Sequence, residues 1–311
     1  MAKRATSARH GFILVDKPRG PTSHDMVLMV RRVLAGGSVG HAGTLDPMAT
    51  GLLVLAVGQA TKLLQFVTLE DKEYQATITL GSETDTLDAE GKVIKLAQPP
   101  EDLSRERVEE RARRFIGTIR QRPPTISAIK RNGIPLYRRA LRGERVEAPL
   151  REVVVHDLRI LDVRGSEIDL HVRCGKGFYL RAFARDLALA LGTVGHLSAL
   201  RRTRIGPFTV DQARVIGEFR AAETDGALRA ALREKLIPLV DACRGMKLLV
   251  LSEEACQHAF HGRPVQISQI CDGSLSESDR GLAALLNQQQ QLVAVARIFE
   301  TELRVIRGFR Y

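Results

Sequence analysis

The spacing of apolar and polar residues predicts a mixture of helices and strands without regular βαβ alternation. Apolar residues at helical spacing predict one helix from Ser23 to the glycine at Gly36, and a second over residues 178–192. Residues 52–58 are apolar throughout, as in a buried strand, whereas residues 73–81 alternate as in a half-buried strand. This order favours an α+β fold with a mixed, mostly antiparallel sheet and flanking helices.

Two segments differ from this background. Residues 120–149 are rich in Pro, Gly and Arg and predict a basic surface loop around a short helix. From residue 247 onward, short strand candidates alternate with polar turns, which is typical of a small separate β-barrel. We therefore expect a first domain over residues 1–243 with an insertion at 120–149, and a second domain over residues 247–311.

Charge narrows the range of partners. The 311 residues carry a net charge of +11, which suits a polyanion. Nucleic acid is the first candidate partner and an anionic membrane surface the second, and a merely soluble basic protein stays open as the simpler alternative. No run approaches the ~20 apolar residues of a membrane helix, and no apolar core of a signal peptide follows the basic N-terminus. Four cysteines without a C-x-x-C pair suit a reducing cytoplasm, so we expect a cytoplasmic protein without a membrane partner.

Several catalytic motifs are absent from the sequence. It has no P-loop, no dinucleotide fingerprint, no nucleophile elbow and no zinc-deaminase signature. Residues 256–261 offer a thiol and two imidazoles but lack a second ligand pair at zinc spacing, so an ordinary helix before Gly262 is the simpler interpretation. These absences favour chemistry by a carboxylate, with no cofactor and no metal.

Asp46 is the candidate carboxylate, in the stretch GHAGTLDPMATGLLVL. A carboxylate in such a turn is a nucleophile, a general base or a turn cap, and taken alone the turn favours the cap. Polar groups at His41 and Thr44 crowd beside Asp46, and nearby glycines permit a close approach of backbone or ligand. These neighbours favour a reactive site.

Two other residues have both a structural and a functional interpretation. Arg181, in the first turn of the second predicted helix together with Tyr179, is either part of a solvated face or a fork-shaped partner for a carboxylate or phosphate. Tyr74, in a predicted strand, is either a packing residue or a platform on which an extruded base stacks. The residues alone leave both questions open.

Six ordered motifs between residues 11 and 208 resemble the tRNA pseudouridine-55 synthases of the TruB type. They are GFILVDKPRGPTSHD, VGHAGTLDPMATGLLVLAVGQATKL, KEYQATITLGSETDTLDAEG, RPPTISAIKRNGIPLYRRALRGERVE, CGKGFYLRAFARDLA and HLSALRRTRIGPF. The tail resembles a PUA RNA-binding domain more weakly, through FHGRPVQI and LVAVARIF.

The resemblance implies the activity and assigns the site. It implies isomerisation of uridine 55 in the T-loop of tRNA, on a flipped-out base, without a cofactor, by an enzyme that needs no guide RNA and that we expect to be a monomer. It assigns three catalytic residues: Asp46 as nucleophile, Tyr74 stacked on the uracil, and Arg181 paired with the aspartate. As substrate-binding residues it implies His41, Tyr179, Leu200, Lys130 in the T-arm-gripping insertion, and Lys17 of a structural Lys-Pro motif. Val54 and Leu55 are expected to help exclude water.

Ile126 and Ala42 depart from the family pattern, where an aromatic residue and a threonine are usual. These departures affect the expected T-arm contacts and leave the catalytic residues unchanged. Two alternatives stay open at this point: a guide-RNA-dependent synthase of the dyskerin type, and an RNA-folding helper.

Overall fold

The computed structural model describes residues 10–309 except 35, 127–129, 132–133, 136–141, 143, 145–147 and 277–278. The described α-helices are α1 (Ser23–Val33), α2 (Leu64–Val67), α3 (Arg105–Arg113), α5 (Leu180–Ala190), α6 (Ile216–Thr224), α7 (Gly226–Glu234) and α8 (Glu253–Phe260). The 3-10 helices are η1 (Gly58–Leu63), η2 (Val210–Gln212), η3 (Leu239–Cys243) and η4 (Ile267–Gln269).

The described strands belong to a large sheet, a C-terminal sheet and two short hairpins. The large sheet contains β1 (Gly11–Lys17), β2 (Val39–His41), β3 (Thr50–Val57), β4 (Lys72–Leu80), β7 (Gly117–Gln121), β10 (Arg151–Arg164), β11 (Glu167–Cys174), β12 (Gly195–Ile205), β13 (Phe208–Thr209) and β14 (Arg214–Val215). The C-terminal sheet contains β15 (Lys247–Leu251), β16 (Val265–Gln266), β17 (Ile270–Asp272), β18 (Gly281–Leu286), β19 (Leu292–Ile298) and β20 (Glu302–Gly308). The hairpins are β5 (Ser82–Thr84) with β6 (Val93–Leu96), and β8 (Lys130–Arg131) with β9 (Ile134–Pro135).

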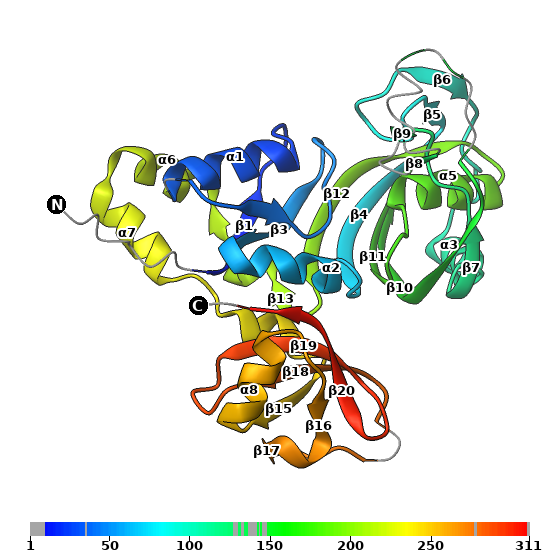
Figure 1. Ribbon diagram of the computed structural model, residues 1–311. Helices are drawn as coiled ribbons and strands as arrows, with labels where there is room; N and C mark the ends of the chain where they lie inside the picture. Colours follow the sequence, from blue (N-terminus) through cyan, green and yellow to red (C-terminus); the bar gives the residue numbers. More distant parts are fainter. Residues whose placement is uncertain are drawn as a thin grey trace.

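The large sheet is mixed and mostly antiparallel. Its strand order is β14-β1-β3-β12-β4-β11-β10-β7, with β2 paired to β3 and β13 to β12. Only the β1–β14 and β3–β12 pairs are parallel. The β3–β12 junction joins the two halves of the sheet, and in Figure 1 β12 and β4 curve between them. This architecture confirms the α+β prediction.

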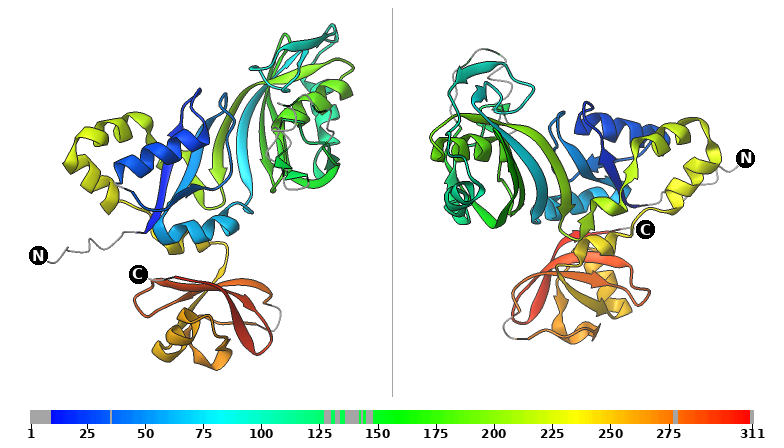
Figure 2. Two further views of the ribbon diagram at one scale, coloured as in Figure 1. Left: turned by 45° about the horizontal axis from the view of Figure 1, so that its top comes forward. Right: turned by 180° about the vertical axis from the view of Figure 1, so that it is seen from behind.

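Helices cover the two ends of the large sheet separately. One end packs α3 and α5 over β4, β10 and β11, and the other packs α1, α6 and α7 over β1 and β3 (Figure 2). Strand β3 is buried on both faces: Leu53 and Leu55 join the core beneath α1, and Leu52 and Val54 join a core shared with the C-terminal sheet. The continuous apolar run therefore reflects burial on two sides, as its pattern predicts.

The six-stranded C-terminal sheet curls into a small barrel-like unit with its own core beneath α8 (Figure 1). A second set of its side chains, including Leu286, Leu292 and Phe309, packs against β1, β3 and α2 of the large sheet. The barrel prediction is confirmed, and residues 256–261 lie in and just after α8 as an ordinary helix would. No described helix combines the length and apolar character needed to cross a membrane.

One local detail differs from the sequence prediction, which begins the first helix with Ser23 as its cap. The N-cap of α1 is Thr22, which forms a capping box with Asp25, and not Ser23, whose hydroxyl is buried against the loop that carries Asp46. Most of the predicted insertion at 120–149 lies outside the described residues. Within it, the structure describes β8 and β9 as a short strand pair.

Candidate active site

Asp46 lies in the loop between β2 and β3, and neighbouring elements hold this loop by its backbone. The Ser23 hydroxyl donates to the carbonyl of Leu45 (3.0 Å) and accepts from its N–H (2.9 Å). The buried ammonium of Lys17 donates to the carbonyls of Pro47 (3.2 Å) and Ala49 (2.7 Å). Because the carbonyls on both sides of Asp46 are bound, the carboxylate projects from a fixed backbone.

Arg181 binds this carboxylate as a two-pronged donor. Its Nε lies 2.9 Å from Oδ2 of Asp46, and its Nη2 donates to Oδ1 at 3.4 Å. The guanidinium also donates to the carbonyls of Thr86 (2.9 Å) and Ile126 (3.0 Å). The Arg181 side chain is 7% exposed whereas that of Asp46 is 36% exposed, so the pair is buried on the arginine side and open on the carboxylate side.

The first turn of α5 positions Arg181. No side chain of α5 itself caps the helix, since Tyr179 at the N-cap makes no side-chain cap bond. Instead the amide of the buried Gln121 in β7 bonds the backbone of Tyr179 from both its atoms, accepting at 2.9 Å and donating at 3.1 Å. The far strand β7 thus fixes the start of the helix that carries the arginine.

Asp88 is a second carboxylate on Arg181, and the sequence analysis did not single it out. Its Oδ2 lies 3.6 Å from Nη1 of Arg181, and its Oδ1 accepts bonds from the Thr86 hydroxyl (2.6 Å) and the Glu90 N–H (3.1 Å). Leu87, just before it, adopts a left-handed φ of 63°. Two acids therefore share one buried arginine, which limits how far the guanidinium can rotate.

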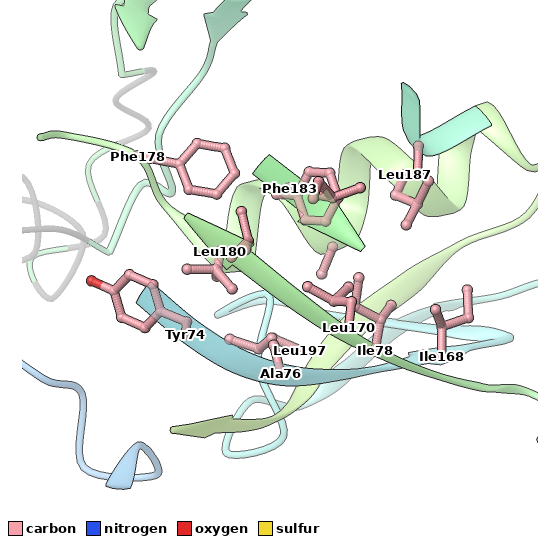
Figure 3. Packing of buried hydrophobic residues seen from close by; sticks show 14 of the residues in the cluster. Tyr74, Ala76, Ile78, Ile168, Leu170, Phe178, Leu180, Phe183, Leu187 and Leu197 are labelled. Carbon is pink, nitrogen blue, oxygen red and sulfur yellow. The ribbon is translucent and has the colours of Figure 1, made fainter. Parts of the chain in front are cut away.

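A cavity of about 600 Å³ opens beside Asp46. Its lining includes Tyr74, Leu200, Tyr179, Arg202 and Lys72 together with Asp46, Asp88 and Arg181. Figure 3 shows Tyr74 at one end of a buried apolar cluster, with its oxygen directed away from the labelled apolar side chains. Burial raises the pKa of Tyr74, so its phenol stays protonated at neutral pH.

Lys72 is a buried cation on the same strand face as Tyr74. Its ammonium donates to the carbonyls of Thr68 (2.6 Å) and Glu70. Burial, and secondarily the charge of Arg202, lowers the pKa of Lys72 from 10.5 to about 8. The cavity therefore contains a group that loses part of its charge in mildly alkaline solution.

The remaining predicted residues lie at different distances from this cavity. Tyr179 and Leu200 line it and are half-buried. His41, at the end of β2, is outside its lining, and burial together with the Arg202 charge lowers the pKa of its imidazole. Lys17 is fully buried with three carbonyl acceptors, so it holds the Asp46 loop and does not face the cavity. Lys130 lies in β8, where the structure describes the backbone only.

The expectation for Val54 and Leu55 is wrong. Both side chains are fully buried in β3, where they contribute to two separate cores, and neither lines the cavity. Both residues follow Asp46 closely in the sequence, but their side chains in β3 do not reach the cavity.

The arrangement combines a carboxylate that is charge-paired yet accessible, an aromatic ring and an apolar wall. Such a set can bind a flat ring and attack it or its attached carbon. Among the described residues, no group of three or more acidic, histidine or cysteine side chains is placed to hold a metal ion.

Comparison with protein families decides the affiliation. Residues 31–180 match the model of the TruB family pseudouridylate synthase N-terminal domain, and residues 181–242 match that of the tRNA pseudouridylate synthase B C-terminal domain. The chain is also 36% identical over 299 residues to tRNA pseudouridine synthase B of Syntrophotalea carbinolica, covering 96% of this chain and 95% of the relative. The chain belongs to the TruB family.

Other relatives agree with this membership. The synthase of the same name from Thermobifida fusca is 47% identical over 222 residues, which is 69% of this chain and 75% of the relative. Among solved structures, a Cbf5–Nop10–Gar1 complex matches with a TM-score of 0.76 and 25% identity over 96% of this chain and 85% of that one. An H/ACA RNP bound to a substrate RNA containing 2′-deoxyuridine matches with a TM-score of 0.71 and 23% identity over 97% and 85% of the two chains. The pseudouridylate-synthase fold of the TruB family therefore surrounds the Asp46 cavity.

Proposed function

We propose that this TruB-family enzyme isomerises uridine to pseudouridine in tRNA, at uridine 55 of the T-loop, with Asp46 as the nucleophile. The observation that carries the proposal is the Arg181–Asp46 pair at the edge of a cavity lined by Tyr74 and Leu200. The names of the relatives, tRNA pseudouridine synthase B, support tRNA as the substrate.

The chemistry suits these side chains. Pseudouridine formation detaches uracil from its ribose, turns it and rejoins it through carbon, with no net redox change. It needs a nucleophile, an enclosed space and a surface that retains the loose base. Asp46 supplies the nucleophile, and Arg181 orients it and offsets the cost of removing its charge from water. Tyr74 stacks on the uracil while it turns, Leu200 excludes water, and no cofactor takes part.

Access to the base requires that the uridine leave the folded T-loop. Extrusion of a base costs a few kcal/mol, so contacts elsewhere on the RNA must offset it. We assign these contacts to His41, Tyr179 and the segment 120–149 with Lys130. The domains follow as a catalytic unit over residues 1–243 and a PUA-like RNA-binding barrel over residues 247–311, in a cytoplasmic monomer.

The net charge of +11 supports a binding free energy in which phosphate contacts are a large part. Raising the salt concentration fourfold should therefore weaken binding of a T-arm hairpin by at least about 10-fold. A fluorescence-anisotropy titration measures this, and an affinity that stays flat with salt contradicts a phosphate-dominated interface.

The test of function uses a T-arm RNA hairpin whose target uridine carries tritium at ring carbon five. Replacement of that hydrogen by the new carbon–carbon bond releases the label. Wild-type protein should release it without any other RNA, and Asp46→Asn should bind the hairpin with unchanged affinity and release none. Release by Asp46→Asn at the wild-type rate would refute the role of Asp46.

A second candidate is supported by the solved structures that match this chain. They are a Cbf5–Nop10–Gar1 complex and an H/ACA RNP, so a synthase that acts within a ribonucleoprotein has the same fold. The hairpin experiment separates the two. Binding without release by wild-type protein would favour a guide-dependent enzyme or an RNA-folding protein over the stand-alone synthase.

A further inference from the structure

Arg202, in β12, is a second buried arginine at the cavity, and the roles assigned above do not use it. Its side chain is 1% exposed. Nε donates to the carbonyl of Leu52 (2.8 Å), Nη2 to that of Gly43 (3.1 Å) and Nη1 to that of Thr44 (3.5 Å). Gly43 and Thr44 directly precede Leu45 and Asp46. The guanidinium therefore holds the loop of the carboxylate by two further carbonyls, which precede in sequence those bound by Ser23 and Lys17.

The same guanidinium contacts Tyr74. Arg202 and Tyr74 are direct partners in the antiparallel β12–β4 register, so their side chains share one face of the sheet. The positive charge of this guanidinium also acts on Tyr74, where it opposes the rise that burial causes in the pKa of the phenol. Both residues line the cavity together with Asp46. One side chain thus connects the loop of the proposed nucleophile to the proposed stacking residue.

Two glycines of the Asp46 motif lie against Arg202, and at Gly51 only a glycine leaves room for its backbone. Gly51 (φ +96°) is opposite Arg202 in the parallel β3–β12 pairing, and a Cβ on it would lie 2.3 Å from the carbonyl oxygen of Arg202. Gly43 (φ +85°) would place a Cβ 3.5 Å from Nη1 of Arg202. The backbone of Arg202 therefore lies against Gly51, and its guanidinium lies against Gly43.

The direction of the hydrogen bonds has a chemical consequence. A guanidinium only donates, so toward Arg202 the Tyr74 oxygen can act only as an acceptor. The phenol O–H is then free to donate to another acceptor, and the cavity that Tyr74 lines is where an extruded base would present its carbonyl oxygens. Within the part of the chain that the structure describes, Arg202 donates to backbone carbonyls, whereas Arg181 also pairs with carboxylates. No described carboxylate therefore pairs with the positive charge of Arg202.

We propose that Arg202 is a positioning residue that fixes the Asp46 loop and the Tyr74 hydroxyl in one arrangement, with the phenol proton directed at the bound base. The proposal rests on the proposed function, because it assigns Arg202 a task in the same reaction. Arg202 acts through Asp46 and Tyr74 and forms no bond with the substrate itself.

The experiment measures single-turnover tritium release from the T-arm hairpin at saturating enzyme, with RNA affinity and thermal unfolding measured in parallel. The variants are Arg202→Gln, Arg202→Lys, Tyr74→Phe and the double variant Arg202→Gln/Tyr74→Phe. The matched control is Arg201→Gln, since Arg201 is adjacent on β12 and forms a two-pronged pair with Asp16 (3.0 and 2.7 Å) away from the cavity.

Arg202→Gln should slow release by about 30-fold or more while RNA affinity stays within about 3-fold. Arg202→Lys keeps the charge and one donor, so its rate should lie between those of wild type and Arg202→Gln. The double variant should lose less than the product of the two single effects, by about 5-fold or more, because both changes break one interaction. Arg201→Gln should stay within about 3-fold of the wild-type rate.

Two results overturn the proposal: an Arg202→Gln rate within about 3-fold of wild type, or single effects that multiply in the double variant. If Arg202→Gln does not fold, Arg202→Lys decides, and a wild-type rate in it is then the overturning result. Asp46→Asn, run alongside, keeps the two claims apart. An inactive Asp46→Asn with a fully active Arg202→Gln would reject this inference alone, whereas an active Asp46→Asn would reject the proposed function.

Discussion

The cavity around Asp46 can be compared with a second hollow, a cleft lined by Glu73 and Arg204 of the large sheet and by Lys247 and Asp279 near the C-terminal barrel. Both contain acids and bases, but they hold them differently. In the cavity, Arg181 and Asp88 are 7% and 6% exposed, and Arg181 serves two carboxylates and two carbonyls. In the cleft, Lys247 and Asp279 are 41% and 23% exposed and pair with each other, and Asp279 also accepts from the N–H of Ser276. In the cavity, the charged side chains of Arg181 and Asp88 are buried and Arg181 contacts several partners at once. In the cleft, the charged side chains of Lys247 and Asp279 pair where water reaches them.

The difference shows which charges determine the geometry. A surface pair contributes about 0–1 kcal/mol, because water competes for both partners. Removing one member of a buried set leaves a charge with neither water nor a partner, which costs about 3–5 kcal/mol. We therefore expect substitutions in the cavity to alter both activity and stability, and matched substitutions in the cleft to alter little.

The largest effect is expected for Arg181→Met. It leaves Asp88 buried without its cation and frees Asp46 to rotate, so release should slow by about 1000-fold and the free energy of unfolding should fall by about 3 kcal/mol. Single-turnover release and urea unfolding measure the two effects. Arg185→Met, one turn along α5 and paired with Asp186, is the control and should keep the wild-type rate. A rate loss below about 10-fold in Arg181→Met would contradict the account.

Asp88→Asn should have the next largest effect. The amide keeps the shape and an acceptor for the Thr86 hydroxyl and the Glu90 N–H but removes the charge that helps fix Arg181. We expect release to slow by about 30-fold with unchanged RNA affinity. Asp85→Asn in the same turn, where the side chain is exposed, should match wild type. Equal rates for the two variants would show that Asp88 has no part in placing Arg181.

Lys72→Met should change how stability depends on pH. The pKa of Lys72 is about 8 when folded and 10.5 as its ordinary value, so between these pH values the folded protein has released a proton that the unfolded chain retains. Wild-type stability from this group therefore rises with pH across that window, and below it the buried charge is a constant cost.

The variant lacks this rise, so the stability of wild type relative to Lys72→Met should increase by about 3 kcal/mol as the pH passes through the window. Urea unfolding at a series of pH values measures it. Burial raises the pKa of Cys174 to about 12, so this thiol also affects how stability depends on pH. Subtracting the stability of Lys72→Met from that of wild type separates the contribution of Lys72 from that of Cys174. A difference that is flat with pH would place the ammonium in contact with water.

The smallest effect is expected in the cleft. Lys247→Met removes the cation of the exposed Lys247–Asp279 pair, and both stability and release rate should stay close to wild type, within about 0.5 kcal/mol and 2-fold. A loss of RNA affinity with an unchanged single-turnover rate would instead identify the cleft as a contact for the RNA. The exposed pair in the cleft would then have a role in binding.

Helices and strands whose apolar residues recur at regular spacing could be predicted from the sequence. Strand β12 shows why others could not. β12 carries register shifts between Leu197 and Ala199 and between Arg202 and Arg204, which break the alternation that identifies a strand. From its local sequence, Arg202 is expected to face solvent. It is buried because the carbonyls of Leu52 in β3 and Gly43 in the Asp46 loop, about 150 residues earlier, accept its hydrogen bonds. No local window contains that information.

The site shows the same division. Asp46, Tyr74 and Arg181 were assigned by resemblance, and the structure brings all three to one cavity. Asp88 lies inside one of the six motifs, but the sequence does not mark it as a site residue, because only the fold shows that its turn pairs with β12 and reaches Arg181. Lys17 was grouped with substrate-binding residues, whereas its burial under three carbonyls supports a role in holding the Asp46 loop.

The central claim is that Asp46 reacts because its loop and Arg181 hold the carboxylate in one place. Asp46→Glu tests this most directly, since it keeps the charge and the chemistry but moves the carboxylate by about one bond length. With the backbone fixed, the account predicts single-turnover release at least about 100-fold slower than wild type, with RNA affinity and thermal stability preserved. A rate close to wild type would show that any carboxylate at this position suffices, and would contradict the account.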